Sequence, residues 1–548
     1  MPRFSPRTQL QSHEVTNQPR EFAGLNLYTT DRALRDAVRR EAGDWLDQRL
    51  IALGQTLGSE AVLESGEAAN RYLPELVTFD RYGRRVDEVR FHPSYHQLMS
   101  LGMEHGIHDL AWVEDKPGRH VAYMAMAALF NQVEAGVTCP LGMTYACVPV
   151  LRAHPSVGQP WLDKILGGRY EAQLKPIEQK VGVTVGMAMT EKQGGSDVRA
   201  NTTRAEPIDA ASGRYRLVGH KWFCSAPMCD GFLTLAYTAN GLSCFLVPRI
   251  IDGERNTMHL MRLKDKLGNK SNASSEIEYH GATGLLIGEE GRGVNVIIDM
   301  VHHTRLGTMA GALGIMRMAL AQAVHHTSGR RAFQKTLIDQ PLMRRTLADL
   351  ALEYEAAVIL SARVARSFDG DTEGDRQFAR LAVAIGKYWL TKRAPGFVFE
   401  CLECHGGAGY IEESPLPRLF RESPLNAIWE GSGNVIVLDI LRTFRKEPES
   451  VELYLAEVFK AKGMNSRLDG AIASLTEGLR QRSQEAMGRR LVERMALVLQ
   501  GALMVHHAPP AMADAFCASR FGSDWGLMYG TLPPGCNVDA IISRHHQD

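Results

Sequence analysis

Several features that would assign this chain to a common protein class are missing from its 548 residues. Lys and Arg together number 62, as do Asp and Glu, so no overall positive charge favours nucleic acid, although a local basic patch stays open. The longest apolar run, residues 121–130, is about half of what a membrane-spanning helix needs. The polar N-terminus contains no apolar core of an export signal. We therefore expect a cytoplasmic globular protein without a membrane segment.

Metal, haem and dinucleotide motifs are missing as well. The nine cysteines are scattered and odd in number, which favours reduced thiols over a disulfide framework. Pairs of adjacent histidines cannot chelate a metal from one helix, because neighbouring helical residues face different directions, so we expect no metal site. No Gly-x-Gly-x-x-Gly opens a helix after a strand. Residues 401–405 fit the c-type haem pattern, but no export signal delivers the chain to a haem-loading compartment.

The hydrophobic periodicity changes twice along the chain and indicates the fold class. A helical period is followed by short β-branched segments between Gly, Pro, Asn and Asp residues, and the helical period then returns. The helical segments are 31–53, 106–135, 293–327, 341–367, 376–400, 433–446, 450–506 and 511–521. The strand-like segments are 181–189, 215–219, 233–238, 242–248 and 275–279. This order predicts a mostly α protein with a central antiparallel β domain and an additional C-terminal helical domain. We place the domains at 1–180, 181–290, 291–446 and 447–548.

Two stretches are typical of a flavin site. Residues 188–200, AMTEKQGGSDVRA, place hydroxyls, carboxylates and paired glycines in a turn after a strand, where the main chain can approach a flat polar ring and a pyrophosphate. A second stretch, ECHGGAGY at 403–410, continues through Glu413, Arg418 and Glu422. Taken separately, TEKQ or GGSD of the first stretch could be a solvated turn. Together the two stretches fit both signatures of the acyl-CoA dehydrogenases, and the chain resembles that family over about residues 60–445.

The resemblance implies non-covalently bound FAD and assigns its contacts. Thr190 and Ser196 are expected to bond the ring and the pyrophosphate, and Ser225 to lie near flavin N5. Phe223 occupies the position of a family tryptophan, with Trp222 as an open alternative. Arg330 is expected to reach the FAD of a neighbouring subunit, although Gln334 replaces a family glycine nearby. The remaining expected contacts are Met189, Ile428 and Asn434.

Glu430, in the sequence Ile428-Trp-Glu-Gly431, is the candidate catalytic base. In the family a carboxylate removes the α-proton of an acyl thioester while the flavin takes hydride from the β-carbon. Such a base works best when partial desolvation raises its pKa toward the working pH. Thr304 stands where some members carry their base, so no second base competes. The alternative is that Glu430 only caps a helix beginning near Gly433.

The chain continues for about a hundred residues beyond Lys446, which general members of the family lack. Its motifs resemble those of the alkylation-response members of the family. That resemblance implies a homotetramer, weak isovaleryl-CoA dehydrogenase activity, binding to double-stranded DNA, and a role in the response to DNA alkylation.

Support for DNA binding from the residues themselves comes from two basic runs, and the second of them contains Arg480, Arg482, Arg489, Arg490 and Arg494. Arg442, Arg445 and Lys446 fall three and four positions apart and could form one basic face that contacts phosphates. Residues 442–548 contain 13 Lys and Arg against 12 Asp and Glu, so a solvated, salt-bridged helix is the alternative. Two interpretations therefore stay open, a DNA-associated flavoprotein and a metabolic dehydrogenase for a short branched acyl-CoA.

Overall fold

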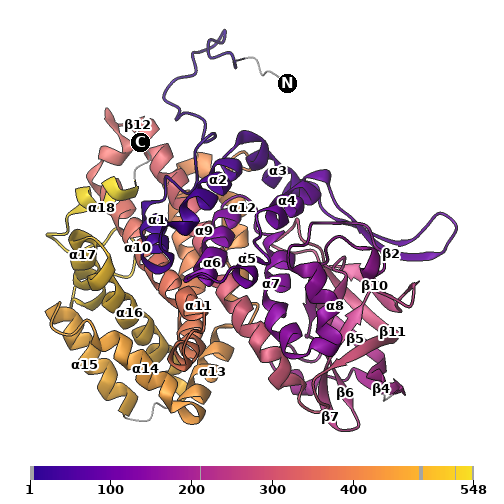
Figure 1. The fold of residues 1–548 in the computed structure, drawn as a ribbon. Coiled ribbons are helices and arrows are strands. Elements are labelled where there is room, and N and C mark those ends of the chain that lie inside the picture. The colour runs from indigo at the N-terminus through magenta and orange to yellow at the C-terminus, as the bar shows by residue number, and fades with distance from the viewer. Residues whose placement is uncertain (1–4, 210–211, 481–484, 525, 546–548) are drawn as a thin grey trace.

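The computed structural model describes residues 5–209, 212–480, 485–524 and 526–545. Its N-terminal part is helical (Figure 1). These helices are α1 (Arg32–Ala42), α2 (Asp47–Leu57), α3 (Glu60–Arg71), α4 (Pro93–Glu104), α5 (Leu110–Val113), α6 (Arg119–Asn131), α7 (Thr138–Ala153) and α8 (Pro155–Ile165). A hairpin of β1 (Glu75–Phe79) and β2 (Arg85–Arg90), which the periodicity did not predict, interrupts them. The hairpin is tied to the β domain, since the Leu260 N–H donates to Asp87 Oδ1 at 3.0 Å.

The central β domain contains a seven-stranded sheet. Its strands are β3 (Val185–Ala188), β4 (Arg204–Asp209), β5 (Arg214–Ser225), β6 (Gly231–Thr238), β7 (Gly241–Pro248), β10 (Met258–Leu263) and β11 (Ser274–Ile287). They run in the order β10-β11-β5-β4-β6-β3, and β7 pairs with β11 and β6. Short strands β8 (Ile250–Ile251) and β9 (Glu254–Arg255) form a separate pair.

The prediction of a purely antiparallel domain was wrong in one respect. Strand β6 pairs in parallel with β3 and, at one residue, with β4. Parallel pairing needs a long connection between the two strands. The chain provides one, because about forty residues, including β4 and β5, separate the end of β3 from the start of β6.

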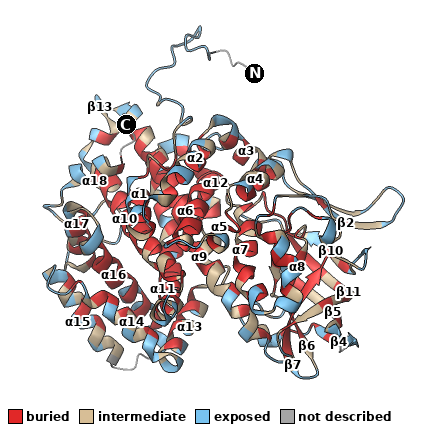
Figure 2. Ribbon diagram, in the orientation of Figure 1, coloured by how far each residue is buried: buried red, intermediate tan, exposed pale blue. Residues whose placement is uncertain are grey.

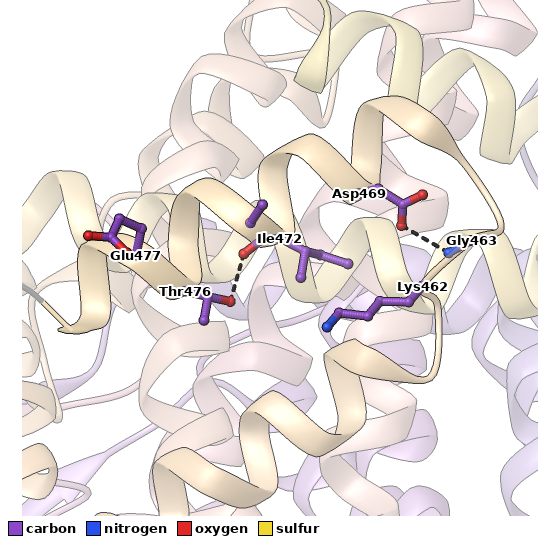
Figure 3. A pocket seen from close by; sticks show the side chains of 7 residues that line it. Lys462, Gly463, Asp469, Ile472, Thr476 and Glu477 are labelled. Atoms are coloured by element: carbon purple, nitrogen blue, oxygen red, sulfur yellow. Dashed lines mark hydrogen bonds between the residues drawn. The ribbon is translucent and has the colours of Figure 1, made fainter.

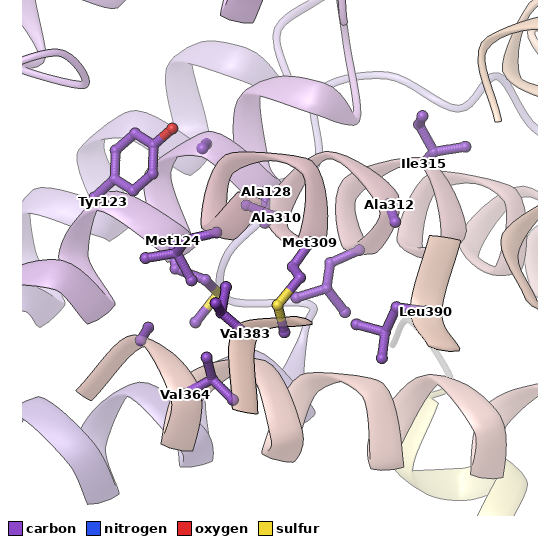
Figure 4. Close-up of a cluster of buried hydrophobic side chains, with 14 of the residues drawn as sticks. Tyr123, Met124, Ala128, Met309, Ala310, Ala312, Ile315, Val364, Val383 and Leu390 are labelled. Atoms are coloured by element: carbon purple, nitrogen blue, oxygen red, sulfur yellow. The ribbon is translucent and has the colours of Figure 1, made fainter. Parts of the chain in front are cut away.

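A second set of helices forms the centre of the molecule. It comprises α9 (Gly293–Gly329), α10 (Pro341–Ser367), α11 (Glu373–Glu403), α12 (Leu416–Glu422) and α13 (Gly433–Lys446). Side chains from α6, α9, α10 and α11 meet in the cluster of Figure 4, and Figure 2 shows much of these helices as buried. Helices α6 and α9 touch closely, because a Cβ on Gly314 would lie 2.3 Å from the Ala128 carbonyl oxygen.

The predicted C-terminal helical domain is confirmed. Its helices are α14 (Pro448–Phe459), α15 (Ser466–Arg480), α16 (Gly488–His507), α17 (Pro510–Phe521) and α18 (Val538–His545), and they pack on one side of α10 and α11 (Figure 1). Buried ion pairs fasten it there, since Arg520 Nη2 lies 2.8 Å from Asp349 and 3.0 Å from Glu353 of α10. Among the residues that the structure describes, no helix has the length and apolarity to cross a membrane.

Candidate active site

The first motif forms a tight turn directly after β3. Met189 and Thr190 follow the last strand residue, and the Trp222 N–H of β5 donates to the Thr190 carbonyl at 2.7 Å. Gly195 lies close to Thr190, because a Cβ added to Gly195 would lie 2.9 Å from Thr190 Cγ2. Ser196 is exposed at the outer side of the turn. The turn therefore presents hydroxyls and main chain at its surface, as the flavin prediction requires.

A buried ion pair holds this turn against β5. Lys221 Nζ lies 2.8 Å from Glu191 Oε1, and both side chains are fully buried. The Glu191 carboxylate also accepts the N–H groups of Thr202 at 2.6 Å and Thr203 at 3.2 Å. Burial alone would raise the pKa of Glu191, but Lys221 and these hydrogen bonds lower it to about 2. The turn at 188–200 and strand β5 thus form one structural unit.

A β-bulge explains why Trp222 and Phe223 could not be distinguished by sequence. In β5, Lys221 pairs with Ile277 and Cys224 with Ser275, so two residues of β5 oppose only one of β11. Such a bulge interrupts the strict alternation of side chains. Phe223 is 48% exposed, whereas Trp222 is half-buried and its ring lies 3.1 Å from Lys264 Nζ. Phe223 is therefore the more open of the two rings.

Glu430 lies in a left-handed turn between Trp429 and α13. Its φ of 56° is unusual for a residue with a side chain and is followed by Gly431 at 97°. Its carboxylate accepts a hydrogen bond from Thr304 Oγ1 of α9 at 2.5 Å. Burial raises the pKa of Glu430, and the Thr304 hydrogen bond and the cations Lys387 and Arg305 reduce that rise without cancelling it. Glu430 is half-buried, and a partly desolvated carboxylate with a raised pKa has the properties of a general base.

Cys139 of α7 lies where the β domain and the Glu430 turn meet. Burial raises the pKa of this thiol to about 12. Lys266 lowers this pKa, Glu430 raises it, and a hydrogen bond with Ser225 lowers it, so all three groups lie near enough to act on the thiol. Ser225 Oγ lies 3.2 Å from Ser274 Oγ, which accepts a hydrogen bond from Lys266 Nζ at 2.9 Å. The structure thus brings the predicted flavin N5 contact and the predicted base into one region of the molecule.

Asn434 and Ile428 flank the Glu430 turn. Ile428 is 63% exposed. Asn434 is exposed near the start of α13, and its Oδ1 accepts a hydrogen bond from Arg489 Nε of α16 at 2.7 Å. Arg489 of the additional domain therefore contacts Asn434, a residue predicted to contact the flavin. The sequence did not predict this interaction.

Within one chain, Arg330 lies outside the region that contains Glu430 and Ser225. It follows the last residue of α9, about 39 Å along the helix axis from Thr304 at 1.5 Å per residue. Its Nη1 donates to the Asn17 carbonyl at 3.0 Å, and the nearby Phe333, between β12 (Arg331–Ala332) and β13 (Lys335–Thr336), is 93% exposed. Its predicted flavin contact requires a second copy of the chain and stays a prediction.

The three predicted DNA contacts lie on the exposed side of α13. Arg442, Arg445 and Lys446 are all exposed, and none lies within 4 Å of a carboxylate in the described ranges. They follow Asn434 and Leu438 at helical spacing, so one face of α13 leads from the flavin region to the basic residues. Of the second arginine run predicted by sequence, Arg482 and the side chain of Arg480 lie outside the described part of the chain.

A hollow of about 430 Å³ lies in the additional domain, away from these residues (Figure 3). It is lined by α15 and by the turn before it, where the Gly463 N–H donates to Asp469 Oδ1 at 2.9 Å. None of the predicted flavin, base or DNA residues contributes to it.

Three functional residues escaped sequence reasoning. No motif singles out Lys221, and Thr304 stands out in the sequence only as the place where other members carry their base. Lys387 stands within the apolar segment 382–390, AVAIGKYWL, of α11. A single lysine in a segment otherwise suited to burial signals a buried partner, because lysine is seldom buried unpaired. That signal was present in the sequence.

These residues fit a flavin by their chemistry. The turn at 189–196 offers hydroxyls and main-chain groups for a polar ring edge and a pyrophosphate. The exposed side chains of Phe223 and Ile428 supply apolar surface that a flat ring would cover.

Comparisons with known proteins identify the family. The family models that match are the adaptive response protein AidB N-terminal domain at residues 17–172, the acyl-CoA dehydrogenase middle domain at 186–282, and the acyl-CoA dehydrogenase C-terminal domain at 291–444. The chain is 46% identical to AidB of Escherichia coli (strain K12), a protein named as an acyl-CoA dehydrogenase, over 94% of this chain and 96% of that one.

Two further relatives extend the comparison. The chain is 25% identical to a mitochondrial isovaleryl-CoA dehydrogenase of Oryza sativa, over 76% of this chain and 98% of that one. The crystal structure of Caenorhabditis elegans ACDH-11 in complex with C11-CoA superposes with a TM-score of 0.83 and 26% identity, covering 96% of this chain and 94% of that one. The chain belongs to the AidB branch of the acyl-CoA dehydrogenase family and is an oxidoreductase of that type, which uses non-covalently bound FAD.

Proposed function

We propose that the protein oxidises a short branched acyl-CoA at a low rate, with Glu430 as the base that removes the α-proton. The observation that carries this proposal is the position of Glu430, a half-buried carboxylate with a raised pKa in the same region as Ser225. The choice of substrate is supported by the similarity to the rice isovaleryl-CoA dehydrogenase. The C11-CoA complex of the C. elegans protein supports an acyl-CoA ligand in general.

Each residue of the site has a separate role in the proposed reaction. The hydroxyl of Thr304 donates to Glu430 Oε2 and so fixes the direction of the carboxylate. Burial makes the carboxylate more basic than an exposed one, which favours transfer of the α-proton to it. Bound FAD would accept the hydride from the β-carbon. The turn at 189–196, Phe223, Ile428 and Asn434 would hold the ring and the pyrophosphate.

Glu430→Gln tests the assignment of the base. The amide keeps the size of the side chain but cannot accept the proton, so acyl-CoA oxidation should fall by roughly 10²- to 10⁴-fold while FAD stays bound. Glu422→Gln is the matched control, because burial also raises the pKa of Glu422, to about 7. It should retain most of the activity. Turnover by Glu430→Gln at the wild-type rate would mean that another group is the base.

The second part of our proposal is that the protein is a cytoplasmic homotetramer that binds double-stranded DNA during the response to DNA alkylation. The 46% identity to AidB supports the assignment, and three exposed, unpaired cations on α13 supply a face that fits phosphates. The alternative is a metabolic dehydrogenase for a short branched acyl-CoA without a DNA role.

Replacing Arg442, Arg445 and Lys446 with alanine tests the DNA face. Binding should weaken about equally for all duplexes, and the slope of log K against log salt should flatten by about 0.9 per lost phosphate contact. The control replaces three other exposed cations of the additional domain, Lys460, Lys462 and Arg467, and equals the test variant in charge. If both triple variants bind as wild type does, α13 is a solvated helix.

A further inference from the structure

Lys387 is a buried cation that the proposed reaction does not yet include. It lies in α11 and is 1% exposed. Its Nζ donates to the Trp429 carbonyl at 2.8 Å and also to the Gly431 carbonyl. These two carbonyls stand on either side of Glu430. Across the described part of the chain, no carboxylate oxygen lies within 4 Å of Lys387 Nζ. In that part of the chain the ammonium therefore binds main-chain carbonyls and forms no ion pair.

The two carbonyls need this donor because of the backbone around Glu430. A left-handed conformation costs a residue with a side chain about 1–2 kcal/mol, and Glu430 adopts it at φ 56°. Two successive residues with positive φ, Glu430 and Gly431, accompany a backbone course in which the Trp429 and Gly431 carbonyls both face Lys387 of α11. Buried carbonyls without a donor are costly. Lys387 supplies both donors and so stabilises the conformation in which the Glu430 side chain faces Thr304.

The Lys387 ammonium also affects the protonation of the Glu430 carboxylate. Burial lowers the pKa of Lys387 to about 7, the Glu430 carboxylate raises it, and the cations Arg305 and Lys392 lower it. In the other direction, burial raises the pKa of Glu430, and Lys387 is among the groups that reduce that rise. The ammonium therefore favours the carboxylate form of Glu430, which is the form that accepts a proton.

We propose that Lys387 is a positioning residue for the catalytic base, which holds the carbonyls on both sides of Glu430 and keeps its carboxylate both aimed and charged. This inference rests on the proposed function, because it takes Glu430 as the base. A merely structural lysine would stabilise the fold without acting on the proton transfer.

The test compares Lys387→Met with a control variant that removes another lysine bound to two main-chain carbonyls. Lys180 Nζ also donates to two carbonyls two residues apart, those of Glu171 and Gln173, and pairs with Asp230 at 2.9 Å. Lys180→Met should lower the melting temperature with little effect on kcat. Lys387→Met should retain FAD but lower kcat roughly a hundredfold, as expected for a misplaced catalytic group. KM should change far less than kcat.

The pH profile separates positioning from a structural role. Without the ammonium, the rise of kcat with pH that reports deprotonation of Glu430 should move to higher pH. The difference from wild type should be largest below pH about 7, where Lys387 is charged. If Lys387→Met binds FAD and keeps the kcat and pH profile of wild type, or loses no more activity than Lys180→Met, the proposal is overturned.

Two further measurements keep the test decisive. If Lys387→Met does not fold, Lys387→Gln retains a donor without the charge, and its profile must move in the same direction. If wild type oxidises no acyl-CoA, the proposed function fails, but infrared difference spectra between wild type and Glu430→Gln still record the titration of the Glu430 carboxyl. Lys387→Met or Lys387→Gln should move that titration to higher pH, and an unmoved titration would refute the role of Lys387.

Discussion

The buried pair of Lys221 and Glu191 offers a sharp test of how the flavin turn is held. Lys221→Met removes the ammonium but preserves the length of the side chain, so the Glu191 carboxylate stays buried without its cation. Breaking a fully buried pair in this way costs about 3–5 kcal/mol. Both side chains are fully buried, so solvent cannot compensate for the loss. The turn at 188–200 should loosen, and affinity for FAD should fall.

The assay follows thermal unfolding and release of FAD in the same sample. Because the pKa of Glu191 is about 2, below its ordinary value of 4.5, the stabilisation is full above pH 4.5 and is lost as the pH falls toward 2. The deficit of Lys221→Met should therefore be large at neutral pH. Adding Glu191→Gln to Lys221→Met removes the uncompensated charge and keeps one acceptor oxygen for the N–H of Thr202 or Thr203, so this double variant should be more stable than Lys221→Met. A Lys221→Met protein with wild-type melting and FAD affinity would refute the reasoning.

Further predictions concern the cofactor, acid stability and the additional domain. Acid precipitation should release FAD into the supernatant, and flavin that stays with the pellet would show a covalent link. Burial lowers the pKa of His303 to about 4 from its ordinary 6.5, so its contribution to stability, on the order of 3 kcal/mol, should be lost as the pH falls from 6.5 to about 4. The melting temperature of His303→Phe should therefore depend less on pH over that range than that of wild type. An unchanged dependence of the melting temperature on pH would contradict this prediction. Arg520→Met should leave Asp349 and Glu353 of α10 short of a cation, and limited proteolysis should then cleave the additional domain faster while FAD stays bound.

The sequence by itself predicted the family and the succession of helical, β and helical regions, and it named Glu430 as the candidate base. Helical and strand periods are local, since residues three or four apart in a helix, or two apart in a strand, share a face. The flavin turn could be predicted because its glycines and hydroxyls are consecutive in the chain. Glu430 could be predicted because its neighbours at 428–431 form a recognisable motif.

Only the tertiary structure decided which distant residues support these motifs. Lys221 and Glu191 are thirty positions apart, Thr304 and Glu430 are 126 apart, and Lys387 is more than forty positions from the carbonyls that it holds. The parallel pairing of β3 with β6 and the bulge at Trp222 and Phe223 depend likewise on how separate strands meet. The physical reason is that a buried polar group needs a partner from any element that packs against it, and neither periodicity nor motif spacing records which elements will pack together.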